Sequence, residues 1–245
     1  MTQNLPTPIE LIIALDFSSG AEALKLIEET KEFTPIYKVG SELFLAVGPE
    51  WVRSRVSEGC RIFLDLKFHD IPNTVAKASV QACELGVEMF TLHLVGGPKM
   101  IEAVKFEMNL WAEKNKIEKQ PKVLGVSVLT SFDQATWDEV SFAVSDKSSK
   151  IEGSVQRLVS QARFWGVDGV VCSPHELPIV RELDRFLYTV VPGIRPAGSK
   201  ADDQARKMTP KKARALGANA VVVGRPIKEA KSSKAMVEKI LKDLR

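Results

Sequence analysis

The stretch RIFLDLK, residues 61–67, is the part of the sequence that says most about the fold. Because side chains alternate along a β-strand, its aliphatic residues share one face, and Phe63, Asp65 and Lys67 lie on the other. We expect the aliphatic face to pack against helices. Asp65 and Lys67 should then point to the opposite side, toward the mouth of a barrel.

Similar short apolar runs, rich in β-branched residues, recur along the whole chain. They occupy residues 11–16, 35–40, 61–67, 89–95, 122–129, 169–172, 188–194 and 220–225. Such runs are typical of strands in a parallel sheet that is covered on both faces. Segments with helical periodicity lie between them, such as residues 74–85 before Gly86 and the apolar stripe from Met236 to Leu244.

This alternation of strand and helix, repeated about eight times, predicts an α/β fold of the closed (β/α)8 TIM-barrel type. An open sheet with a dinucleotide site should show GxGxxG after its first strand, but residues 16–20 read DFSSG. Residues 131–150 are expected to form a long loop with some helical content. Since no linker or low-complexity segment interrupts the chain, residues 1–245 are expected to form one domain.

Composition excludes several functional classes. The chain has 245 residues with 34 Lys and Arg against 31 Asp and Glu, and this net charge of +3 is too small for a nucleic-acid-binding protein. No apolar run approaches the roughly 20 residues of a membrane helix, and no secretory signal is visible, so we expect a cytoplasmic protein with no membrane contact. Cys60, Cys83 and Cys172 are widely spaced and are expected to be reduced thiols.

Polar side chains recur where the predicted strands end, which is where (β/α)8 barrels carry their active sites. They are Asp16, Lys38, Asp65 and Lys67 in the first three strands, and Thr130, Arg195, Gly224 and Arg225 after the fifth, seventh and eighth. An isolated Asp-x-Lys is more often a structural ion pair than a catalytic one. With Lys38 and Asp70 nearby, however, four charges of alternating sign gather at one mouth. Such clusters are costly to bury and favour a catalytic interpretation.

A phosphate site is predicted at the end of the chain. Residues 192–196 (PGIRP) follow the seventh predicted strand and residues 223–226 (VGRP) follow the eighth, and barrels often bind phosphate with these two loops. Glycine lets backbone N–H groups approach an anion, and arginine adds charged donors. One Gly-Arg pair alone would indicate an ordinary turn, but two at these positions favour a site.

No metal or cofactor is expected. The three histidines, His69, His93 and His175, have no metal-ligand spacing, and His93 is expected to be a hydrogen-bonded core residue. Asp16, Asp65 and Asp70 could in principle hold Mg²⁺. The two lysines among them argue against this, because ammonium groups would compete for the same carboxylates.

Residues 63–74, FLDLKFHDIPNT, resemble the signature of the orotidine 5′-monophosphate decarboxylase family. The family's other motifs are matched in order by ALD (14–16), YKVG (37–40), LTS (129–131), PGIR (192–195) and VGR (223–225). Residues 94 and 95, Leu-Val, are bulkier than the family pattern. The resemblance implies a cofactor-free (β/α)8 barrel that removes CO₂ from orotidine 5′-monophosphate to give UMP in pyrimidine synthesis.

The resemblance also implies a role for each charged residue. Lys67 would protonate C6 of the pyrimidine as CO₂ leaves, and Asp65 would lie near the substrate carboxylate. Lys38 would bind the ribose while it holds Asp65 and Asp70 in one charge network. Asp16 would accept a ribose hydroxyl.

The remaining implied roles concern the base, the phosphate and a second subunit. Thr130 would face the pyrimidine. The phosphate would be held by Arg195, Gln204, Gly224 and Arg225, with residues 195–204 as part of a closing loop. Asp70, Ile71 and Thr74 would reach the neighbouring active site, which implies a homodimer.

Two alternatives stay open at this point. Asp65-x-Lys67-x-x-Asp70 fits equally well a Mg²⁺-dependent sugar-phosphate barrel, such as a keto-gulonate phosphate decarboxylase or a hexulose phosphate synthase. Lys38, residues 71–74 and residues 192–195 favour the nucleotide decarboxylase. The second alternative is a catalytically silent barrel that only binds nucleotides, which would have been free to lose its charge network.

Overall fold

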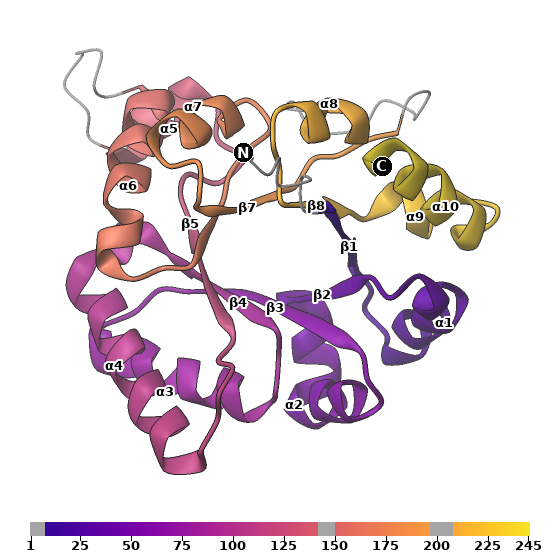
Figure 1. Ribbon diagram of the computed structural model, residues 1–245, viewed down its shortest axis with the longest axis horizontal. Helices are drawn as coiled ribbons and strands as arrows, with labels where there is room; N and C mark the ends of the chain where they lie inside the picture. Colours follow the sequence, from indigo (N-terminus) through magenta and orange to yellow (C-terminus); the bar gives the residue numbers. More distant parts are fainter. Residues whose placement is uncertain (1–7, 142–149, 197–207) are drawn as a thin grey trace, which may run out of the picture.

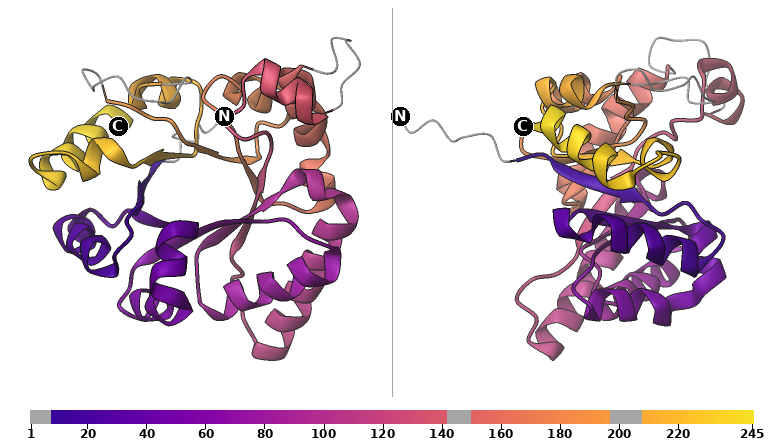
Figure 2. Two further views of the ribbon diagram at one scale, coloured as in Figure 1. Left: turned by 180° about the vertical axis from the view of Figure 1, so that it is seen from behind. Right: turned by 90° about the vertical axis from the view of Figure 1, so that its right-hand side faces the viewer.

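A computed structural model describes residues 8–141, 150–196 and 208–245. Within these residues, eight parallel strands pair in chain order and close into a barrel, with β8 hydrogen-bonded to β1. Helices surround the strands, and the two halves of the chain form opposite sides of the ring (Figures 1 and 2). The predicted (β/α)8 TIM barrel is therefore confirmed.

All eight expected strands are present. They are β1 (Glu10–Ala14), β2 (Ile36–Gly40), β3 (Arg61–Phe68), β4 (Met89–His93), β5 (Lys122–Val126), β6 (Gly169–Val171), β7 (Tyr188–Val191) and β8 (Ala220–Val223). The helices are α1 (Gly20–Thr30), α2 (Ser41–Ser57), α3 (Pro72–Glu84), α4 (Gly97–Asn115), α5 (Gln134–Ser141), α6 (Ile151–Trp165), α7 (Leu177–Leu183), α8 (Pro210–Ala215), α9 (Arg225–Lys228) and α10 (Ser233–Leu244). Short 3₁₀ turns occupy Lys31–Phe33 and Leu94–Gly96.

Local signals place the helix ends. Ser19 and Ser232 cap α1 and α10, since each side chain accepts a backbone N–H of the first turn. Pro72 opens α3, where a missing N–H costs nothing, and Gly86 follows its end with a φ of +74°. None of the described helices is long and apolar enough to cross a membrane.

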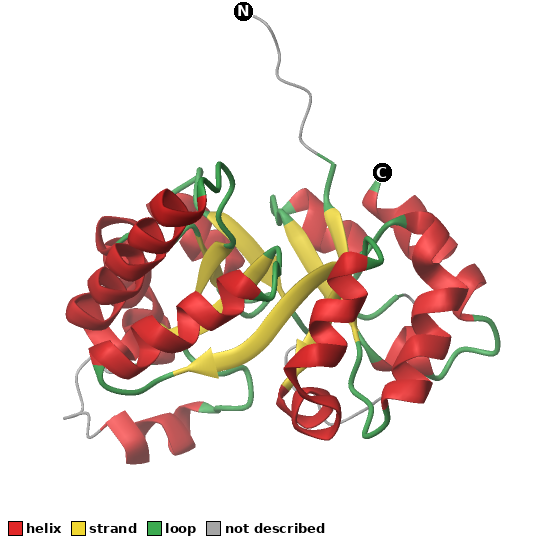
Figure 3. Cartoon of the chain, turned by 90° about the horizontal axis from the view of Figure 1, so that it is seen from below, coloured by secondary structure: helices red, strands yellow, loops and turns green. Residues whose placement is uncertain are grey.

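The strands separate two apolar layers. Helices lie on the outer side of the strands (Figure 3). The layer inside the barrel is formed by Ile12, Ala14, Ile36, Phe63, Met89, Leu124, Val190, Ala220 and Val222. Ile62 and Leu64 belong to the outer layer, whereas Phe63 faces the interior. The alternation predicted for residues 61–67 is therefore confirmed.

Six strands end one to three residues earlier than their apolar composition suggests. The expected strands 11–16, 89–95, 122–129, 169–172, 188–194 and 220–225 stop at Ala14, His93, Val126, Val171, Val191 and Val223. The composition misleads because the following loops are buried too: Val128 and Ile194 are at most 2% exposed although they lie outside the strands. Residues 134–141 of the expected loop 131–150 form α5, and residues 142–149 lie outside the described part of the chain.

The bulky pair that departs from the family pattern is accommodated by a glycine. Leu94 is fully buried, and Val95 is about half exposed. A Cβ atom built on Gly125 of β5 would lie only 2.4 Å from Leu94 Cδ2. The absence of a side chain at Gly125 therefore makes the room that Leu94 occupies in the outer apolar layer.

The N-terminal ends of the strands are joined by a charged network around Arg61. Its Nε and Nη2 atoms donate to the two carboxylate oxygens of Glu88 at 2.7 Å each, and Nη2 also contacts Glu10. Tyr188 donates to Glu10. Burial alone would raise the pKa of Glu88, but the hydrogen bonds and charge of Arg61 outweigh it and hold that pKa below its usual range.

We expect Glu88→Gln to lower the free energy of unfolding at pH 7 by about 1–2 kcal/mol, since Arg61 is itself partly exposed and screened. A lowered native pKa stabilises the fold above the unfolded pKa of about 4.3 and loses that effect as the pH falls through the native value. The difference between wild type and variant in urea denaturation should therefore shrink from pH 7 to pH 3. The control is Glu84→Gln at an exposed position. A difference that does not change with pH would contradict this account.

Candidate active site

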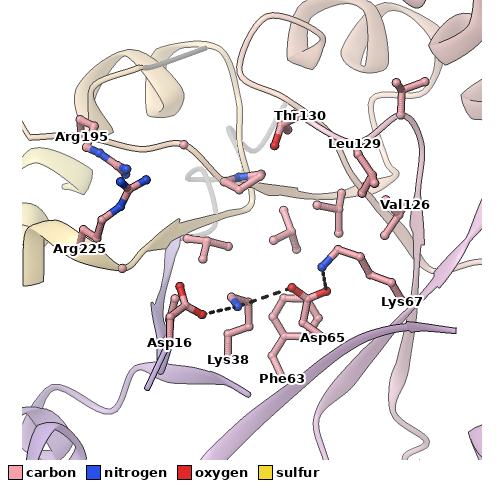
Figure 4. Close-up of a pocket in the computed structure, with 18 residues that line it drawn as sticks. Asp16, Lys38, Phe63, Asp65, Lys67, Val126, Leu129, Thr130, Arg195 and Arg225 are labelled. Atoms are coloured by element: carbon pink, nitrogen blue, oxygen red, sulfur yellow. Dashed lines mark hydrogen bonds and ion pairs between the residues drawn. The ribbon is translucent and has the colours of Figure 1, made fainter. Parts of the chain in front are cut away.

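A pocket opens at the C-terminal ends of the strands (Figure 4). It brings together these residues predicted from the sequence: Asp16, Lys38, Asp65, Lys67, Thr130, Arg195, Gly224 and Arg225. Acidic and basic side chains occupy one side and the two arginines another. Apolar side chains between them form the floor: Ala14, Phe63, Val126, Val171, Val190 and Val222.

Four charged side chains form a row of alternating sign. Asp16 Oδ1 lies 3.1 Å from Lys38 Nζ, Lys38 Nζ lies 3.6 Å from Asp65 Oδ2, and Asp65 Oδ1 lies 2.9 Å from Lys67 Nζ. The side chains of Lys38 and Asp65 are only 13% and 12% exposed, whereas those of Lys67 and Asp16 are 36% and 58% exposed. The inner pair is therefore shielded, and the two ends of the row are open to the pocket.

The row keeps its buried carboxylate ionised. Burial alone would raise the pKa of Asp65. The positive charges of Lys38 and Lys67, together with hydrogen bonds from Lys67 and Thr91, outweigh this effect and hold the pKa of Asp65 below its usual range. An ionised Asp65 in turn supplies the negative charge that both ammonium groups require.

Lys67 has an unusual backbone conformation. Its φ of +53° lies in the left-handed region, which costs a residue other than glycine about 1 kcal/mol or more. The pairing of β3 with β4 shifts register between Leu64 and Phe68, so Lys67 lies in a bulge. Its backbone N–H donates to the hydroxyl of Thr91 at 2.9 Å, and that hydroxyl donates to Asp65 Oδ1 at 2.9 Å.

Sequence reasoning missed Thr91. It lies in β4 within the apolar run MFTLH and is fully buried. A single hydroxyl residue in a buried strand was the only available signal. It indicates that a partner must exist, but not which one.

The two arginines converge on one side of the pocket (Figure 4). Arg195 follows β7, and its backbone N–H donates to the carbonyl of Met208 at 2.8 Å. Gly193 has a φ of +77°, which a side chain would strain. A Cβ on Gly224 would lie 3.3 Å from the Cβ of Ala14, which is tighter than an ordinary contact, so Gly224 lets the backbone pass close to β1. Two guanidinium groups beside such loops suit a phosphate dianion.

A further contact missed in the sequence links the two ends of the pocket. Lys228 of α9 donates to the backbone carbonyl of Asp16 at 2.5 Å, and its ammonium lies 4.3 Å from the centroid of the Phe17 ring. The loop after β1, which carries one charge of the row, is thus hydrogen-bonded to the helix that begins with Arg225.

The residues implied to reach a second subunit lie apart from this pocket. Asp70 is exposed, and its carboxylate accepts the N–H of Ile71 at 2.6 Å. Ile71 is 66% exposed, and Thr74 is exposed at the start of α3. Within one chain, Asp16 therefore takes the fourth place in the charge row that the sequence suggested for Asp70. Gln204, with residues 197–207, lies outside the described residues.

Two of the three histidines form a pair near the row. The ring centroids of His69 and His93 are 5.5 Å apart. Burial, together with the charges of His69 and Lys67, lowers the pKa of His93, which is only partly buried and not the core residue expected. Among the described residues, no group of three or more His, Cys, Asp or Glu side chains is arranged to hold a metal ion.

Comparison with known proteins agrees with this geometry. Residues 10–240 match the family described as "Orotidine 5'-phosphate decarboxylase / HUMPS family". An orotidine 5'-phosphate decarboxylase of Legionella pneumophila (strain Corby) is 41% identical over 96% of this chain and 99% of its own length. One of Vibrio cholerae serotype O1 is 40% identical, covering 94% and 96%.

A solved structure gives the same result. The crystal structure of orotidine 5'-phosphate decarboxylase from Lactobacillus acidophilus has a TM-score of 0.84 and 33% identity, covering 97% of this chain and 99% of that one. The sequence identity to these relatives, over nearly the full length of both chains, is higher than a shared barrel fold alone would produce. This chain belongs to the orotidine 5'-phosphate decarboxylase / HUMPS family.

Proposed function

We propose that this chain is a carboxy-lyase that converts orotidine 5′-monophosphate to UMP in pyrimidine biosynthesis. The observation that carries the proposal is the row Asp16–Lys38–Asp65–Lys67, which faces two arginines across an apolar floor. Relatives about 40% identical over nearly their full length are named for this activity.

The proposed chemistry centres on Lys67. Loss of CO₂ from C6 of the pyrimidine leaves a carbanion in the plane of the ring, with no conjugated system to delocalise it. An ammonium group beside C6 stabilises this charge and then supplies the proton. Lys67 is suited to the role because Asp65 holds its Nζ at 2.9 Å, while the side chain stays partly open to the pocket. Asp65 would also lie near the substrate carboxylate.

The other pocket residues would bind the rest of the nucleotide. Asp16 and Lys38 would contact the ribose, and Thr130 would face the pyrimidine. The phosphate would be held by Arg195, Gln204, Gly224 and Arg225. The apolar floor would exclude water from the reacting carbon, and a drier site strengthens the attraction between Lys67 and the developing charge. No cofactor is needed in this scheme.

We extend the proposal to the assembly. Residues 1–245 would form a single domain, and two such domains would form a homodimer. Asp70, Ile71 and Thr74 would complete the neighbouring site. This is supported by the exposure of all three and by the large apolar side chain of Ile71, which is 66% exposed in the isolated chain.

A second candidate is a Mg²⁺-dependent sugar-phosphate barrel, because the family name also covers HUMPS proteins and the Asp65-Lys67-Asp70 pattern fits both. Lys38 argues for the nucleotide decarboxylase. Its ammonium lies between the carboxylates of Asp16 and Asp65, and Lys67 contacts Asp65 from the other side. Two ammonium groups thus occupy positions around Asp65 that a divalent cation would require.

Absorbance of orotidine 5′-monophosphate should fall when purified protein is added, at the same rate with and without EDTA. This follows because the ammonium of Lys67, and not a bound cation, stabilises the carbanion. Neither conversion of the nucleotide nor binding of UMP would favour the Mg²⁺-dependent sugar-phosphate class. UMP binding without turnover would favour the silent binder.

Lys67→Ala should retain UMP binding, measured by calorimetry, and lose kcat by at least about 10³-fold, since the proton donor to C6 is removed. Lys25→Ala, at an exposed position of α1, serves as the control and should keep wild-type kcat. Normal turnover by Lys67→Ala would show that another group protonates C6.

Mixing Lys67→Ala with Asp70→Ala protein should restore up to about one quarter of wild-type activity after random subunit exchange, because half of the dimers are mixed and each has one intact site. The matched control mixes Lys67→Ala with Asp65→Asn. That mixture should stay inactive, because both residues belong to the same subunit's part of the site. No recovery in the first mixture would argue against Asp70 crossing the interface.

A further inference from the structure

We propose that Thr91 is a positioning residue, which fixes Lys67 relative to Asp65 so that the ammonium reaches the reacting carbon. This inference rests on the proposed decarboxylation. Thr91 is fully buried in β4 and is not among the residues that line the pocket. It therefore acts through Lys67 and Asp65 and not by contact with a substrate.

The hydroxyl of Thr91 closes a ring of three hydrogen bonds. It accepts the backbone N–H of Lys67 at 2.9 Å and donates to Asp65 Oδ1 at 2.9 Å. The same Oδ1 accepts from Lys67 Nζ at 2.9 Å. A hydroxyl carries a single proton, and the hydroxyl of Thr91 donates it to Asp65. The same oxygen accepts the N–H of Lys67, so the roles of donor and acceptor in the ring are fixed.

This ring explains how Lys67 keeps its left-handed backbone. At a φ of +53° in the bulge between β3 and β4, the residue needs its surroundings to hold it. Thr91 bonds to the backbone of Lys67, and Asp65 bonds to the end of its side chain. Both ends of Lys67 are thereby fixed, which is the arrangement that places a long, flexible side chain reproducibly.

The hydroxyl also helps to keep Asp65 ionised. Charged and titratable groups face this carboxylate from three neighbouring strands: Lys38 on β2, Lys67 on β3 and His93 on β4, with Asp16 beyond Lys38. Burial raises the pKa of Asp65, and the two lysine charges, the Lys67 hydrogen bond and the Thr91 hydrogen bond lower it further than burial raises it. Removal of the hydroxyl should therefore shift protonation of Asp65 to higher pH.

The test replaces Thr91 by Val, which keeps the shape and removes both hydrogen bonds, and by Ser, which keeps the hydroxyl. We expect kcat of Thr91→Val to fall roughly 10- to 100-fold, with KM nearly unchanged, since a small displacement of the catalytic group is enough. The acid limb of its kcat profile should move to higher pH. Thr91→Ser should retain most of the wild-type kcat and the wild-type pH profile.

Thr30→Val is the matched control for stability. Thr30 is equally buried, and its hydroxyl donates to the carbonyl of Leu26 at 2.7 Å and bonds Tyr37 Oη at 2.9 Å, away from the pocket. Its variant should lose stability in urea and keep the wild-type kcat. If Thr91→Val does not fold, Thr91→Cys takes its place, and its weaker hydrogen bonds should give a kcat between those of wild type and Lys67→Ala.

Several results would overturn the proposal. They are a wild-type kcat and pH profile in Thr91→Val, or in Thr91→Cys where that variant takes its place, and a Thr91→Ser variant as slow as Thr91→Val. The failure of the proposed function would look different. Wild-type protein would then leave orotidine 5′-monophosphate unchanged, which overturns both ideas, whereas active wild type with an unaffected Thr91→Val variant overturns only the role of Thr91.

Discussion

The buried carboxylate of Asp65 is the constraint around which the pocket is built. A carboxylate that is almost fully enclosed loses its hydration, and only close positive charges and hydrogen bonds can offset that loss. Lys38 and Lys67 supply the charges from the same strand and its neighbour, and Thr91 supplies a hydrogen bond from the strand on the other side. The local geometry of three strands is therefore tied to one ionised group.

The closed barrel makes this arrangement possible, because each strand brings one or two side chains to the same mouth. The two ends of the barrel then carry different tasks. At the N-terminal end, Arg61 and its partners link β1, β3, β7 and Glu88, the residue before β4, in a network away from the pocket. At the C-terminal end, the charged row and the arginines are left partly open, as a site for an anionic ligand requires.

The number of strands and most of the pocket were predictable from the sequence, because apolar runs report burial and polar residues at their ends stand out against them. The strand ends were not predictable, since buried loop residues such as Ile194 have the same composition as the strand before them. Two contacts in the site were not predictable. Asp16 was predicted for the pocket, but not its ion pair with Lys38, and nothing in a lone Thr91 indicates that it faces Asp65.

The contact of Leu94 with Gly125 couples the 3₁₀ turn after β4 to the neighbouring strand β5. With Leu94 in place, a Cβ atom at position 125 would lie 2.4 Å from Leu94 Cδ2 and 2.7 Å from its Cγ. A side chain at position 125 therefore requires the Leu94 side chain to move or to become smaller. The size of the side chain at position 94 thus depends on the absence of one at position 125.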